Sequence, residues 1–74
     1  MPVTFTDHAA WRTAERHMAS VCLDEIGREI QTAIDNGWYG AEERSGCRIV
    51  TVRSGERFVV DTRETEAVVV TALG

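Results

Sequence analysis

The apolar residues of this chain change their spacing once, close to Gly37, and that change limits the folds open to it. Before it, apolar positions recur three and four residues apart, a spacing that predicts an amphipathic helix. After it, Val, Ile, Thr and Phe gather in short runs that predict strands, at residues 47–53, 57–61 and 65–73. The sequence therefore predicts a single α+β domain over residues 1–74.

Two helices are expected before the change in spacing. Side chains that cap helices cluster around Thr6, so the first helix is expected over about residues 6–19. The second is expected over residues 22–36 and should end at Asn36-Gly37, because glycine favours the end of a helix. Few residues join the two helices, which favours an N-terminal helical hairpin.

The hairpin is expected to pack on one face of an antiparallel β-meander of three to four strands, formed by residues 46–73. Ser54-Gly55 predicts a tight two-residue turn, and residues 39–44 are a weaker candidate for an edge strand. Because two helices cover only one face, the other face should keep part of an apolar surface. That surface should include some of Val50, Val52, Val59, Val68 and Val70.

The size of the chain makes a homodimer an expectation. A domain of 74 residues buries a modest fraction of its surface and is often stabilised by self-association. Cys22 and Cys47 stand in apolar surroundings and are expected to be unpaired and buried. No apolar run is long enough for a signal peptide or a membrane span, so a cytoplasmic protein with no membrane partner is the simplest interpretation.

The charge of the chain restricts how it could meet nucleic acid. Twelve acidic and eight basic residues give a net charge of −4, which argues against coating nucleic acid by charge alone and leaves room for a local basic site. All eight basic residues are arginine. Guanidinium suits bidentate contacts to phosphate, although a GC-rich genome produces the same bias without a functional cause.

A row of cationic side chains is the most informative motif. His8, Arg12 and Arg16 are four residues apart, which places them on one side of the first helix. The opposite side is expected to face the core, through Ala10, Trp11, Ala14 and Met18. Two guanidiniums beside an imidazole suit phosphate chemistry, but they also suit a solvated helix face.

The charged and aromatic residues also have structural interpretations that require no functional site. Glu15 lies within reach of Arg12 and could pair with it. Trp38 and Tyr39 are expected to anchor the core rather than to stack on bases. No metal and no cofactor are expected, because Gly-rich phosphate loops, Cys-x-x-Cys and His-Glu-x-x-His are missing from the sequence.

The string His8-Ala-Ala-Trp-Arg12-Thr-Ala-Glu-Arg16, the helix after it and the final valine-rich run through Thr71 resemble a family of small bacterial proteins of unknown function. That family is grouped with the RelE/ParE and BrnT ribonuclease toxins. The resemblance implies a metal-independent endoribonuclease in which His8 transfers protons. Arg12 and Arg16 would hold the phosphate, aided by a sheet arginine such as Arg48. It also implies RNA and an antidote protein as partners.

The alternative is a binding module without chemistry. An acidic homodimer, regulatory or phage-borne, would grip another protein with its open sheet face. This alternative accounts for the net charge of −4 and for the uncovered valines. It gives the His8 row no role.

Overall fold

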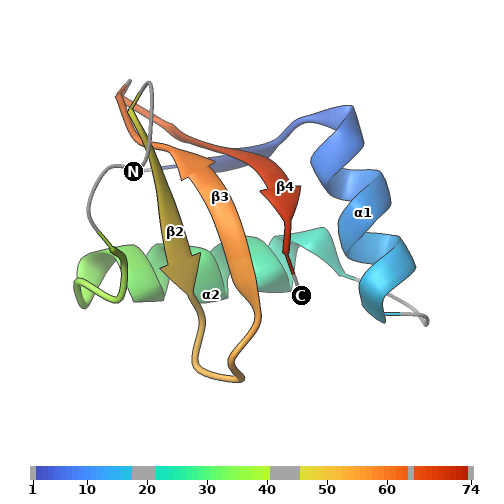
Figure 1. The fold of residues 1–74 in the computed structure, drawn as a ribbon, viewed down its shortest axis with the longest axis horizontal. Coiled ribbons are helices and arrows are strands. Elements are labelled where there is room, and N and C mark those ends of the chain that lie inside the picture. The colour runs from blue at the N-terminus through green and yellow to red at the C-terminus, as the bar shows by residue number, and fades with distance from the viewer. Residues whose placement is uncertain (1, 18–21, 41–45, 64, 74) are drawn as a thin grey trace.

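The computed structural model describes residues 2–17, 22–40, 46–63 and 65–73, which confirm the α+β class. A four-stranded sheet with the strand order β1-β4-β3-β2 packs with two helices (Figure 1). The elements in chain order are β1 (Val3–Phe5), α1 (Asp7–His17), α2 (Leu23–Asp35), β2 (Cys47–Thr51), β3 (Arg57–Asp61) and β4 (Ala67–Ala72).

The sheet is mixed, whereas the sequence predicted an antiparallel one. The pairs β2–β3 and β3–β4 are antiparallel as expected, but β1 pairs in parallel with β4, with Thr4 opposite Val68. The sequence analysis missed β1 because the run Val3–Phe5 is only three residues long. Its partner lies at the other end of the chain, so no local pattern could reveal the pairing.

Each helix packs on the sheet by itself, and the expected helical hairpin is not evident. α1 lies against β4 and β1, whereas α2 lies against β1 and β2. Figure 1 shows α1 standing beside β4 and α2 running across the strands. The physical reason is β1, which enters the sheet next to β4 and brings the start of α1 with it. The expected connection at residues 18–21 lies outside the described residues.

The turn after α2 follows the prediction. Gly37 adopts a φ of 75°, its N–H donates to Ile34 O at 3.1 Å, and the N–H of Trp38 donates to Ala33 O at 2.8 Å. This double closure is the Schellman arrangement, which requires a left-handed residue and therefore favours glycine. Tyr39 then forms an isolated β-bridge with Val50. Residues 41–44 of the expected edge strand lie outside the described residues.

The turn between β2 and β3 is longer than predicted. Val52 N–H donates to Glu56 O at 3.0 Å, which leaves Arg53, Ser54 and Gly55 as a three-residue loop. The φ of 101° at Gly55 suits the last position of such a loop, where a left-handed residue is needed. The sequence analysis read Ser54-Gly55 as the whole turn because it placed Arg53 in the strand.

The core lies between the helices and one face of the sheet. Phe58, Ile30, Val50, Val60 and Val69 are its largest fully buried apolar side chains. Two of the five valines considered for the open face, Val50 and Val52, are buried in this core. They share the inner face because alternate residues of a strand point to the same side.

The outer face of the sheet and the two cysteines differ in how far they follow the prediction. Val59 and Val68 are half-buried and Val70 is 36% exposed, so part of the expected apolar surface is present. Both cysteines are free, as predicted, but Cys22 is exposed and Cys47 is half-buried. The expectation of burial was wrong because Cys22 is the residue just before α2, outside its apolar stripe.

Candidate functional site

The buried side of α1 differs from the one predicted. Ala9 and Thr13 are fully buried, whereas Trp11 is 60% exposed and Ala14 is exposed. Helix α1 packs closely against β4, and such close packing favours small side chains over the large indole. The predicted face was wrong because Trp11, the largest apolar residue of the helix, lies outside the core. Met18, which was part of the expected stripe, lies outside the described residues.

The cationic row therefore borders the packed side of α1. With His8 at zero, Arg12 falls at about 40°, whereas the buried Ala9 and Thr13 fall at about 100° and 140°. The side chain of Arg12 is accordingly 28% exposed. Arg16 belongs to α1, but its side chain lies outside the described part of the chain. His8 and Arg12 thus lie next to the sheet, although the sequence predicted a row that points away from the core.

The exposed imidazole of His8 contacts the sheet through Thr71. Its Nε2 lies 3.3 Å from Thr71 Oγ1, and its ring centroid lies 6.5 Å from that of Trp11. Thr71 is paired with Val59, on the strand positions that alternate with the buried ones. His8 therefore lies at the rim of the open sheet face.

A capping arrangement fixes the first turn of α1 and with it His8. Thr6 Oγ1 accepts a hydrogen bond from Ala9 N–H at 3.0 Å, the bond expected of a helix cap. The same hydroxyl donates to Val70 O at 3.3 Å, and Thr6 N–H donates to Val69 O at 3.1 Å. One threonine thus starts the helix and attaches it to β4, and the prediction of a helix start at Thr6 or Asp7 is confirmed.

The ion pair anticipated for Arg12 is present. Its guanidinium donates to Glu15 Oε1 at 2.7 Å, between side chains that are 28% and 46% exposed. Such solvated pairs contribute little free energy, and an anionic ligand can compete with the carboxylate. Arg12 therefore keeps its capacity to bind a phosphate.

The structure does not bring Arg48 to this row. Arg48 lies on β2, at the far side of the sheet from β4, and donates to Gly40 O at 3.0 Å. Its guanidinium carbon lies 5.1 Å from the ring centroid of Tyr39. Arg48 pairs with Val60, whereas Thr71 pairs with the neighbouring Val59, so the two side chains leave opposite faces of the sheet.

The candidate site is therefore a surface of three exposed or half-exposed side chains, His8, Trp11 and Arg12, which we call the α1 surface. Thr71 supports it from β4. The sequence did not indicate Thr71 as a site residue, because its contact with His8 joins distant parts of the chain. Within the described residues, no three His, Cys, Asp or Glu side chains come together as a metal site.

No protein-family model, curated protein or solved structure matches this chain. Neither α1 nor α2 combines the length and the apolar character that a bilayer crossing requires. The residues of the chain and their geometry are therefore the basis on which a function is proposed.

Proposed function

We propose that the α1 surface binds an RNA phosphodiester and cleaves it without a metal, as a toxin-like endoribonuclease of the cytoplasm. The observation that carries this proposal is the exposed His8 imidazole held 3.3 Å from Thr71 Oγ1, with Arg12 beside it. The exposed Trp11 adds a ring on which an RNA base can stack. The resemblance to ribonuclease toxins supports the same chemistry and adds an antidote protein as a partner.

The roles of these side chains follow from the reaction. The RNA 2′-oxygen must lose a proton and attack phosphorus, while the 5′-oxygen leaves and gains a proton. His8 is the group proposed to take the proton from the 2′-hydroxyl and to return a proton to the leaving 5′-oxygen, while Thr71 Oγ1, 3.3 Å from its Nε2, orients the ring. Arg12 binds the phosphate oxygens as negative charge builds on them. The side chain of Arg16, one turn further along α1, is proposed to extend this contact.

The test is cleavage of a fluorescent oligoribonucleotide in the presence of EDTA, with purified wild type, His8→Ala and Arg28→Ala. His8→Ala should lower the rate by more than about tenfold, the low end for loss of a proton-transfer group. Arg28→Ala removes an exposed cation from α2 and should cleave like wild type. Circular dichroism should show all three folded. The proposal fails if wild type does not cleave RNA, or if His8→Ala cleaves equally well.

One observation favours the second candidate, an acidic homodimeric binding module. Val70 on β4 is 36% exposed and Val59, Val68 and Ile49 are half-buried, so the open face keeps apolar area that a second copy could cover. Light scattering at micromolar concentration tests it. A dimeric mass that Val70→Asp converts to a monomeric mass supports this candidate, and a monomeric wild type removes it.

A further inference from the structure

Two aromatic rings lie on the surface at the opposite edge of the sheet from α1. Trp38 is 39% exposed and Tyr39 is 42% exposed, so the expectation that they anchor the core was wrong. The physical reason is the Schellman turn at Gly37, which directs the chain out along the edge of β2. Together with Arg48 and Arg53 they form what we call the aromatic surface.

Each ring has a guanidinium over it. Arg53 lies 5.9 Å from the Trp38 ring centroid, and Arg48 lies 5.1 Å from that of Tyr39. Both distances are within the range of cation–π attraction. Arg48 also donates a hydrogen bond to Gly40 O, which ties the Tyr39-Gly40 segment to β2. Arg53 comes from the loop after β2 and is exposed. Among the described residues its side chain contacts the Trp38 ring, which leaves its N–H groups available to a ligand.

The rings line an open hollow of about 540 Å³ on the protein surface. Its other lining residues are Gly40, Thr51, Val52 and Arg53. Arg53 is the one charged side chain among the described residues that line it. The hollow therefore combines flat apolar rings with a single positive charge.

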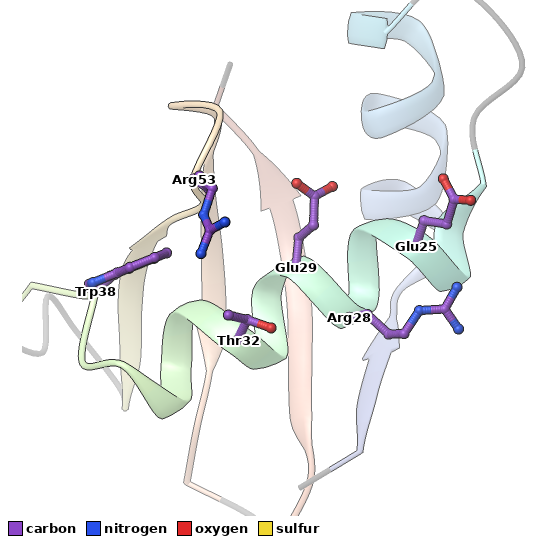
Figure 2. Close-up of a pocket in the computed structure, with 6 residues that line it drawn as sticks. All are labelled: Glu25, Arg28, Glu29, Thr32, Trp38 and Arg53. Atoms are coloured by element: carbon purple, nitrogen blue, oxygen red, sulfur yellow. The ribbon is translucent and has the colours of Figure 1, made fainter.

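A second hollow, of about 440 Å³, lies on the α2 side of Trp38 and is acidic in part. Figure 2 shows Trp38 and Arg53 at one end of it, with Glu29 and Glu25 further along α2. Arg28 also lines this hollow, at the far end from Arg53, so Glu29 is the acidic side chain that follows Arg53 along it. A phosphate bound by Arg53 is therefore expected to lie on the side of Gly40 and Thr51, away from Glu29.

We infer that the aromatic surface binds unpaired bases of a single-stranded nucleic acid, which stack on Trp38 and Tyr39 while Arg53 contacts a neighbouring phosphate. Stacking on exposed rings beside a positive charge is how proteins hold single strands without reading their sequence. An acidic peptide would engage Arg53 but would leave both rings without a stacking partner. The site is separate from the α1 surface, and the inference stands without the ribonuclease proposal.

The test is fluorescence anisotropy at low salt with labelled oligouridylate and oligothymidylate of about twelve nucleotides, a length within the usual range for one single-strand site. Trp38→Ala should weaken binding by about tenfold or more, whereas Trp38→Phe, which keeps a ring, should bind like wild type. Arg53→Gln should weaken binding and lower the salt dependence by about one phosphate contact. Arg57→Gln is the matched control, since it removes an exposed arginine from β3. Glu29→Gln should strengthen binding.

Comparing the RNA and DNA oligonucleotides shows which nucleic acid the aromatic surface binds. Binding of RNA and DNA that depends on Trp38 supports the inference, and binding of RNA alone with the same dependence supports it and narrows the ligand to RNA. His8→Ala should leave this affinity unchanged, so loss of cleavage and loss of binding are told apart. The inference is overturned if neither oligonucleotide binds, or if Trp38→Ala binds as well as wild type. It is also overturned if a polyglutamate peptide displaces the labelled oligonucleotide at a lower concentration than the unlabelled oligonucleotide does.

Discussion

The α1 surface and the aromatic surface place similar side chains on very different supports. His8, Trp11 and Arg12 share one helix, whose start is capped and tied to β4 by Thr6. Trp38 and Arg53 come from two separate turns, one after α2 and one after β2, that meet at the sheet edge. A surface on one helix follows from residue spacing, whereas a surface made of two turns exists only once the sheet has formed.

The largest effect is expected beneath the α1 surface, at Thr13. This residue is fully buried, and its hydroxyl oxygen is the one buried side-chain polar atom without a hydrogen-bond partner among the described residues. Thr13→Val keeps the shape and removes that cost, so it should raise the free energy of unfolding by about 1 to 2 kcal/mol. Urea denaturation measures it. Thr13→Ala leaves a cavity, so its free energy of unfolding should rise less than that of Thr13→Val. If Thr13→Val is no more stable than wild type, the Thr13 hydroxyl has a hydrogen-bond partner.

The next effect concerns the support of the aromatic surface. Gly37→Ala places a β-carbon on a residue with a φ of 75° and should cost about 1 kcal/mol. It should also weaken oligonucleotide binding at Trp38 while leaving RNA cleavage at His8 unchanged. Gly40→Ala is the matched control, because that glycine has open space and no positive φ, and it should be close to neutral. Equal destabilisation by both substitutions would argue against the left-handed turn.

A smaller effect is expected at Glu15, where a substitution should change ligand binding by the α1 surface and leave the fold of α1 intact. Glu15→Gln removes the charge that Arg12 contacts at 2.7 Å and should cost less than about 0.5 kcal/mol of stability. The released guanidinium should bind phosphate more tightly, which lowers KM for the oligoribonucleotide. Glu25→Gln on α2 is the control and should leave KM unchanged. A higher KM in Glu15→Gln would mean that the carboxylate orients Arg12 for its ligand.

The smallest effect is expected at Asp61, on β3 between the two surfaces. Hydrogen bonds from the Arg63 side chain and backbone hold the pKa of Asp61 below its usual value of 3.8. A lowered folded-state pKa contributes stability above pH 3.8 that is lost as the pH falls through the folded value. Urea midpoints at pH 6 and pH 3 should therefore differ more in wild type than in Asp61→Asn. If wild type and Asp61→Asn show the same pH dependence, the Asp61–Arg63 contact does not contribute to stability. RNA cleavage and oligonucleotide binding should be the same in Asp61→Asn as in wild type.

The sequence predicted what depends on local patterns. Both helices begin and end within about two residues of the prediction where described, because Thr6 and Gly37 are local signals for starting and ending a helix. The three C-terminal strands follow from β-branched runs. Val3–Phe5 was missed because its pairing is entirely long-range.

The candidate sites divide in the same way. The shared side of His8 and Arg12 could be read from their spacing, but the face of α1 that packs could not. Packing was decided by the small side chains of Ala9 and Thr13 meeting β4, and this left Trp11 exposed. The contact of His8 with Thr71 joins opposite ends of the chain and carries no local signal.

The parallel pairing of β1 with β4 sets the order in which this protein can fold during synthesis. Before residues 67–72 have been made, β1 has no strand to pair with, and α1 lacks β4, the strand that it mainly packs on. Because such distant contacts form slowly, the meander is expected to form first and the N-terminal segment to dock last. Until that step, His8 has no Thr71 beside it, so the α1 surface is complete only after β4 has joined the sheet.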